Sequence, residues 1–161
     1  MSGKGETPGR LVEVTIDEAS IGRGSPDQEH ERAIAIYDLV QENRFSLAGR
    51  DDGPYALRVA LQDAKLTLAA SPVSGGASAS HTLPLTAFRS FLKDYFLTCE
   101  TYYAAIRTAS PAQIEALDNS RRVIHDEAAA LLLERLAGKI DVDFDTARRL
   151  FTLIVALHWK A

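Results

Sequence analysis

Apolar and polar residues alternate with period two in the first half of the chain, which predicts strands that each bury one face. The alternation is present over residues 12–16, 57–61 and 66–68. The polar residues between the last two segments predict a short turn, so these segments form a hairpin. A further strand is expected over residues 81–85, at an edge of the sheet, because Pro84 has no N–H to donate to a neighbouring strand.

A helix is expected between the first strand and the hairpin, from residue 26 to about residue 42. Ser25 suits the N-cap and Pro26 suits the first helical position. A helical wheel places Ala35 on the solvent side. Four residues form the predicted buried stripe: Ala33, Ile36, Tyr37 and Val40.

The second half of the chain has the period of helices. A long apolar stripe from Phe88 to Ile106 predicts the main core helix. The sequence Ser110-Pro111-Ala112-Gln113 is a cap, a helix-compatible proline and a capping box, so a third helix begins there and continues to about Gly138. The last helix, capped by Asp145, is apolar around most of its circumference and should be deeply packed.

The predicted element order is β-α-β-β-β-α-α-α, which segregates strands from helices. This order indicates an α+β fold, with a small, mostly antiparallel sheet and a C-terminal helical layer packed on one face. The N-terminal segment of residues 1–9 is short, polar and glycine-rich, and we expect it to form a flexible arm. Residues 10–161 are expected to form a single domain.

Composition narrows the functional classes. Hydrophobic residues make up 46% of the chain and charged residues 25%, which is typical of a folded globular domain. The net charge of −4 disfavours binding to nucleic acid or to anionic membranes. The single cysteine, Cys99, cannot close an internal disulfide, and no segment is long and apolar enough to span a bilayer. We therefore expect a cytoplasmic protein.

Three polar residues of the third helix fall within its apolar arc. Asp118, Arg121 and His125 are spaced i, i+3 and i+7, which aligns them on the side that faces other layers of the protein. Such groups need hydrogen-bonding partners or a cleft, because burying them unpaired would cost several kcal/mol. They are the candidate catalytic residues.

The preceding antiparallel helix carries the side chains that would complete a polar pocket. Tyr95, Tyr102 and Tyr103 lie on its stripe, and their hydroxyls need partners when buried. We assign them as candidate ligand-binding residues. The alternative is structural: Asp118 and Arg121 form an ion pair, and His125 donates a hydrogen bond that fixes the helix register.

A second candidate site lies at the start of the first helix. Arg23 follows Gly22, and the backbone N–H groups of a helix N-terminus can bind an anion. His30 lies one turn after the predicted start of this helix and is a candidate base. Plain helix capping explains the same residues, because the segment lacks the spacing of a dinucleotide or P-loop motif. The histidines lie on separate elements without ligand spacing, so no metal site is predicted.

Several segments along the chain are distinctive. They are Ile21-Gly22-Arg23 with Ser25-Pro26, Glu29 to Ala33, Lys93 to Phe96, Ala105 to Ala109, and Val142 to Ile154 followed by Leu157-His158-Trp159. In these segments the chain resembles an uncharacterised protein family of alphaproteobacteria, uncharacterised protein family 0262. The resemblance implies a bacterial cytosolic protein. It implies no substrate, cofactor or catalytic residue.

Two functions from different classes remain open. The first is a binding or regulatory module without catalytic activity, whose partner is a small anionic ligand or a protein. The alternative is a small-molecule hydrolase or transferase, in which Arg121 holds an anionic group, His125 acts as acid or base and Asp118 orients one of them. Homo-oligomerisation is a further possibility, in which Trp159 is an exposed anchor; the alternative is that Trp159 fills a space between elements of the same chain.

Overall fold

The computed structural model describes residues 9–158. Most of the expected N-terminal arm and Trp159 lie outside the described residues. The elements follow one another along the chain as β1 (Leu11–Ile16), α1 (Glu18–Ile21), α2 (Pro26–Gln41), β2 (Phe45–Leu47), β3 (Tyr55–Gln62), β4 (Lys65–Pro72), β5 (Ala79–Pro84), the 3-10 turn η2 (Thr86–Phe88), α3 (Arg89–Ala105), α4 (Pro111–Leu136), β6 (Ile140–Val142) and α5 (Phe144–His158).

The main sheet has four strands in the order β1-β3-β4-β5. β1 pairs with β3 in parallel, whereas the β3–β4 and β4–β5 pairs are antiparallel. The predicted hairpin is confirmed: its two-residue turn is formed by Asp63 and Ala64, whose φ angles of 53° and 59° match the twist of the flanking strands. β5, which ends at Pro84, is an edge strand as expected.

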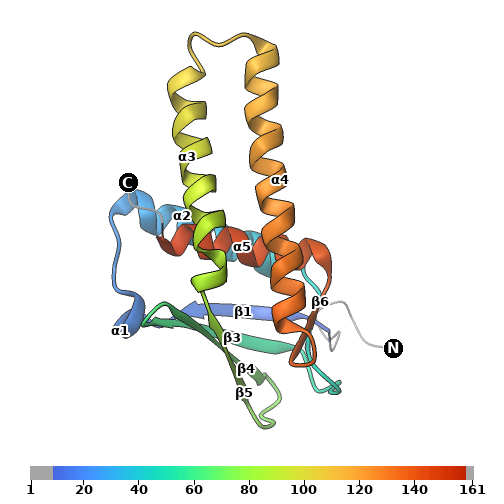
Figure 1. Ribbon diagram of the computed structural model, residues 1–161. Helices are drawn as coiled ribbons and strands as arrows, with labels where there is room; N and C mark the ends of the chain where they lie inside the picture. Colours follow the sequence, from blue (N-terminus) through green and yellow to red (C-terminus); the bar gives the residue numbers. More distant parts are fainter. Residues whose placement is uncertain (1–8, 159–161) are drawn as a thin grey trace.

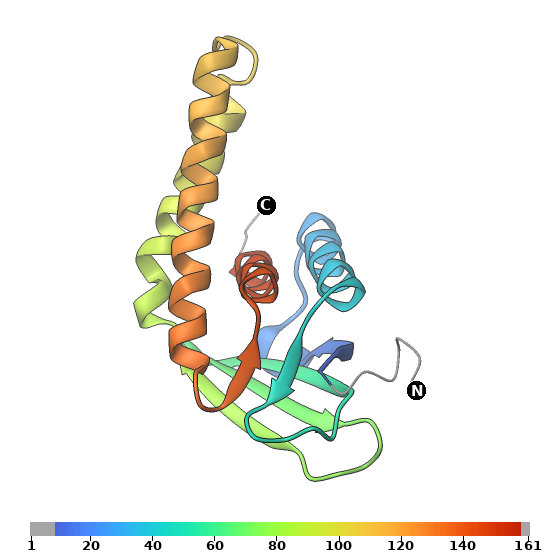
Figure 2. The ribbon, with the colours of Figure 1, turned by 90° about the vertical axis from the view of Figure 1, so that its right-hand side faces the viewer.

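All the long helices lie on one face of this sheet (Figures 1 and 2). The expected α+β architecture, with a small, mostly antiparallel sheet and a C-terminal helical layer, is therefore confirmed. α5 lies closest to the centre, and nine of its residues are buried, which agrees with its nearly all-apolar circumference. The underside of α5 meets the sheet through Leu150 and Leu153, which lie beside Val59 and Leu68.

Two strands escaped the sequence analysis. β2 and β6 are three residues long each and pair antiparallel, with Phe45 opposite Val142. Segments this short show too little alternation to be recognised, and their partners are far apart in the sequence. Their pairing joins the end of α2 to the start of α5.

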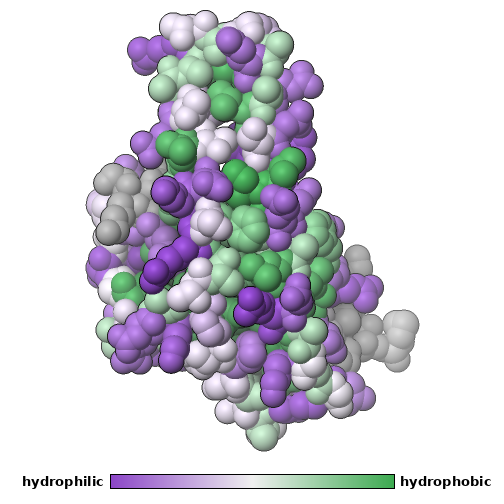
Figure 3. All heavy atoms as spheres, viewed as in Figure 1, coloured by the Kyte–Doolittle hydropathy of each residue, from purple (hydrophilic) through white to green (hydrophobic). Residues whose placement is uncertain are grey.

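The prediction that the helix after Phe88 is the main core helix is wrong. α3 and α4 form a helical hairpin that rises away from the sheet (Figure 1), and Leu92 is the only residue of α3 that is fully buried. Tyr103 remains 61% exposed. The outer half of the hairpin has no third layer to pack against, so its apolar stripe is only partly covered. Apolar residues accordingly gather on the hairpin face seen in Figure 3.

The predicted orientation of α2 is also wrong. Ala35 and Leu39 are buried, whereas Ala33 and Tyr37 are exposed. Arg32, which is 5% exposed, sets this orientation. Its guanidinium donates hydrogen bonds to the carbonyl oxygens of Gly22 at 2.9 Å and of Leu157 at 3.4 Å. A buried cation with these partners turns the helix away from the orientation that apolar residues alone would favour.

Candidate functional site

An open hollow of about 580 Å³ lies above α5, between α2 and the α3–α4 hairpin. Thr152, Val155 and Ala156 of α5 form its floor. The wall from α2 carries Glu31 and Ile34. The opposite wall consists of Tyr95, Phe96, Cys99, Glu100 and Tyr103 of α3 together with Arg121 of α4. Figure 2 shows this arrangement along the axis of α5, with the hairpin on one side and α2 on the other.

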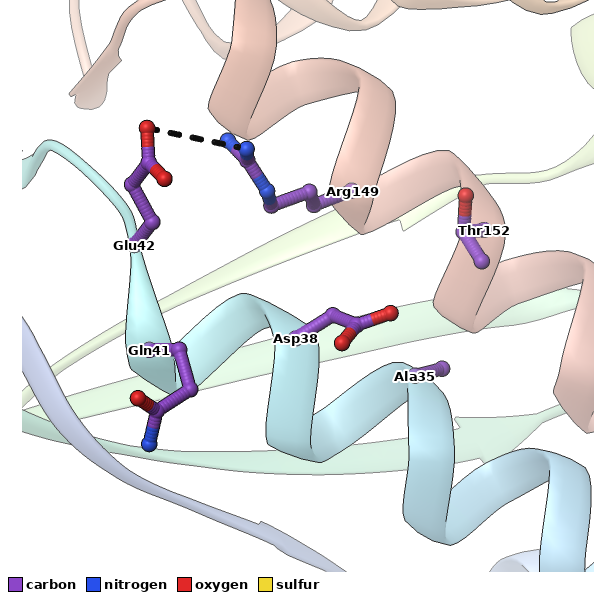
Figure 4. Close-up of a pocket in the computed structure, with 6 residues that line it drawn as sticks. All are labelled: Ala35, Asp38, Gln41, Glu42, Arg149 and Thr152. Atoms are coloured by element: carbon purple, nitrogen blue, oxygen red, sulfur yellow. Dashed lines mark ion pairs between the residues drawn. The ribbon is translucent and has the colours of Figure 1, made fainter.

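A smaller hollow of about 280 Å³ continues toward the start of α5. It shares Ala35 and Thr152 with the larger one, and we call the two together the α5 groove. In Figure 4, the Asp38 carboxylate projects from α2 into the space between the helices, while Arg149 of α5 reaches Glu42 at 3.8 Å. This end of the groove is therefore polar.

Arg121 lines the groove and is ion-paired within the chain. Asp118 forms an ion pair with it, and the guanidinium carbon lies 4.5 Å from the centre of the Tyr102 ring. Partial burial opposes its charge, but the hydrogen bonds with Asp118 and Cys99 prevail and raise the pKa of Arg121. The Arg121 side chain remains 28% exposed, so it can still contact a molecule in the groove.

Tyr95 lies at the base of the groove wall, where its ring meets Phe151 edge to face at 6.1 Å. Burial raises the pKa of Tyr95, and the neighbouring Cys99 adds to the effect. The hydroxyl is thus a neutral hydrogen-bonding group at physiological pH. Tyr103 lines the open part of the same wall, whereas Tyr102 faces Arg121.

His125 does not line the groove. Its ring packs edge to face between Tyr95 at 5.9 Å and Phe151 at 5.2 Å. Nε2 lies 2.8 Å from the carbonyl oxygen of Arg148 and 3.0 Å from the Thr152 hydroxyl. Because the carbonyl only accepts, Nε2 carries the proton. Burial lowers the pKa of His125, so the imidazole is neutral and links α4 to α5.

The polar trio of the third helix is therefore divided between two surroundings. Asp118 and Arg121 are paired at the groove wall, and His125 is enclosed between α4 and α5. The wheel analysis correctly placed all three on the inner face, where they are half-buried. It could not show that this face meets the open groove at Arg121 and packs against α5 one turn later, at His125.

Arg23 and His30 are both exposed and lie outside the α5 groove. The helix start beside them already has its own acceptors. The backbone N–H of Gln28 donates to Ser25 Oγ at 3.1 Å, and that of Gly24 donates to the Glu29 carboxylate at 2.7 Å. A carboxylate of the chain thus sits where an external anion would bind.

Sequence reasoning missed Glu31, Ile34, Glu100 and Thr152 as groove residues. Helical periodicity shows on which side of its own helix a residue lies. It does not show how that helix is placed relative to a neighbouring helix. Ile34 is apolar and 43% exposed and precedes the buried Ala35, but this exposure is visible only in the fold, so no pattern in the sequence marks Ile34 as a groove residue.

No group of three or more His, Cys, Asp or Glu side chains within residues 9–158 is placed to hold a metal ion. Among the helices of the same range, none combines the length and apolar composition that crossing a bilayer requires.

Comparison with known proteins identifies relatives along the entire chain. The model of a family described as "Uncharacterised protein family (UPF0262)" matches residues 8–160. A UPF0262 protein of Methylobacterium radiotolerans is 56% identical over 160 residues, covering 99% of each chain. One from Azorhizobium caulinodans is 58% identical over 95% of this chain and 96% of its own. One from Agrobacterium fabrum is 55% identical over 94% of this chain and 96% of its own. No solved structure matches the chain with statistical significance.

Proposed function

The chain belongs to the uncharacterised protein family UPF0262, and we propose that it acts as a binding module whose ligand sits in the α5 groove. One observation carries this proposal: a hollow of about 580 Å³, within the usual size of a ligand site, opens above the best-packed helix of the fold. Its floor is rigid because α5 is held between the sheet and two other helices. A rigid floor reduces the ordering cost of binding.

The geometry disfavours the catalytic role expected of His125 and leaves ligand binding as the proposed role of the groove. A general base must lie within hydrogen-bond reach of its substrate. The Nε2–H of His125 points at a backbone carbonyl, and neither hollow of the groove is lined by His125. In this proposal Tyr95, Tyr103 and Arg121 contact the ligand, Asp118 and Tyr102 position Arg121, and His125 holds α4 against α5. We also expect the protein to act in the cytoplasm, where the thiol of Cys99 stays reduced.

A site-specific crosslink tests this function. Two tyrosines offer a matched pair: Tyr103 lines the groove and is 61% exposed, and Tyr37 is 63% exposed but lies outside both hollows. Each would be replaced in turn by the photoreactive residue benzoylphenylalanine, in full-length protein produced in an alphaproteobacterium. After irradiation, intact-mass and peptide mass spectrometry would detect an adduct of any chemical class.

We expect an adduct at position 103 and none, or far less of it, at position 37. Equal labelling of the two positions, or no adduct at 103 above the unirradiated control, would refute the groove as the binding site.

A further inference from the structure

The α5 groove has room for one further helix above α5. α5 is covered below by the sheet, on one side by α2 and on the other by the α3–α4 hairpin, and its remaining side is the groove floor (Figure 2). The floor runs from Arg149 to His158, which corresponds to about 14 Å of helix at 1.5 Å per residue. Two to three turns of a further helix fit this length.

The side chains at the bottom of the groove are small. Ala35 of α2 is 2% exposed and Ala156 of α5 is 4% exposed, so they form a floor that offers little contact area of its own. Apolar contact area is available higher up, where Ile34 is 43% exposed and Tyr103 is 61% exposed. A helix with an apolar stripe would cover both residues.

The charged side chains around the groove indicate that a bound molecule carries positive charge. Glu31, Asp38 and Glu100 line the two hollows, and within residues 9–158 no ion pair involves any of them. The two arginines of the groove are different, because Arg121 is paired with Asp118 and Arg149 with Glu42. The unpartnered charges are therefore all negative, and they would attract Lys or Arg side chains flanking the apolar stripe.

We propose that the α5 groove binds an amphipathic helix of a partner protein, with its apolar stripe against the exposed side chains of Ile34 and Tyr103 and its basic residues facing Glu31, Asp38 and Glu100. This inference rests on the proposed function, since it assigns a class of ligand to the same groove. Binding of this kind uses anchors one or two helical turns apart, as in other helix-in-groove complexes. Nucleic acid and anionic lipid are disfavoured by the same carboxylates.

Synthetic peptides test the proposal directly. The probe is a fluorescein-labelled peptide of about fifteen residues, made of Leu, Ala and Lys with Leu at helical spacing. One control has the same composition in an order without helical periodicity, and another has Glu in place of Lys. Binding to the full chain is measured by fluorescence anisotropy at about 0.15 M salt, where long-range attraction between exposed charges is largely screened.

We expect the helical Lys peptide to bind, and the non-periodic and Glu peptides to bind at least about tenfold more weakly, because they lose the apolar stripe or the charge complementarity. Tyr103→Ala and Glu100→Lys should each weaken the binding of the Lys peptide by about fivefold or more. Tyr37→Ala and Glu127→Lys are the matched controls, since both residues are exposed outside the groove, and they should leave binding unchanged.

Several outcomes would overturn the inference. Equal binding of the periodic and non-periodic peptides excludes a helix as the preferred occupant, and a preference for the Glu peptide refutes the charge argument. Equal effects of Glu100→Lys and Glu127→Lys show that binding is not in the groove. A dimer that sediments intact and resists the peptide would make a second copy the occupant. If the peptide fails but crosslinks remain specific to position 103, this inference falls while the proposed function stands.

Discussion

Replacing His125 by Ala is the most informative test of how the polar residues of α4 are used. The substitution removes two edge-to-face ring contacts, with Tyr95 and Phe151, each worth about 0.5–1.5 kcal/mol. It also removes the hydrogen bond to the Arg148 carbonyl, worth about 0.5–1.5 kcal/mol. The ring is only partly buried, which lowers the upper end of this sum, so we expect a total loss of about 1.5–4 kcal/mol.

Chemical denaturation monitored by circular dichroism measures this loss. His30→Ala is the matched control, because His30 is exposed and should change the free energy of unfolding by less than about 0.5 kcal/mol. In a thermal scan, the loss at His125 corresponds to a melting temperature lower by about 5–15 °C for a chain of this size. If His125→Ala and His30→Ala had the same small effect, the structural role of His125 would be refuted.

The pKa of His125 gives this prediction a pH dependence. Burial lowers the pKa of His125 in the fold from its usual 6.5, so the folded state binds a proton less readily than the unfolded state. The contribution of His125 to stability is thus fully present above about pH 6.5 and is lost as the pH falls through the folded pKa. The difference in stability between the wild type and His125→Ala should shrink on acidification, and NMR titration should give a pKa of His125 below 6.5.

Three further substitutions test separate parts of the fold. Phe151→Ala, at a fully buried position of α5, should cost about 3–5 kcal/mol by denaturant titration, and a loss below 1 kcal/mol would contradict the assigned core. Ser110→Ala removes the capping box of α4 and should cost about 1 kcal/mol, whereas Ser120→Ala on the exposed face of the same helix should cost less than half of that. The hydrogen bond from Arg50, followed by the one from Tyr55, lowers the pKa of Asp52 below 3.8, so its stabilising effect is present above that pH and lost on acidification. Asp52→Asn should therefore flatten the stability profile between pH 5 and 2, and an unchanged profile would exclude this contribution.

Much of the fold was predictable because its signals are local. The capping box at Ser110 and Gln113 depends on side chains three residues apart, and it was correctly identified. The β3–β4 hairpin was equally accessible, because its strands alternate and its turn is short. α5 was recognised as deeply packed from its apolar circumference alone.

The errors arose where position depends on a distant partner. α2 turned out to be rotated because Arg32 finds acceptors in Gly22 and Leu157, and the second of these is 125 residues away. α3 has a longer apolar stripe than a surface helix needs, which suggested a core helix. One part of that stripe instead covers α4, and another part, including Phe96 and Tyr103, lines the groove.

Only part of the candidate site was predicted, because some of its residues depend on a distant partner. Tyr95, Tyr103 and Arg121 were named from their helical faces, and all three line the groove. Glu31 and Ile34 come from α2, whose packing against α5 has no local signature in the sequence. Arg23 was suggested by a glycine-rich helix start, but Ser25 and Glu29 already satisfy the backbone N–H groups there.

Helix binding in the α5 groove can be mapped by an NMR titration of the full chain, with labelled methyl groups, against the Leu, Ala and Lys peptide. We expect the largest shifts at Ile34, Ala35, Val155 and Ala156 in the groove, and no shift at Val73 and Val123, which are exposed elsewhere on the surface. Shifts that centre on Val73 or Val123, or that spread evenly over the surface, would contradict binding in the groove.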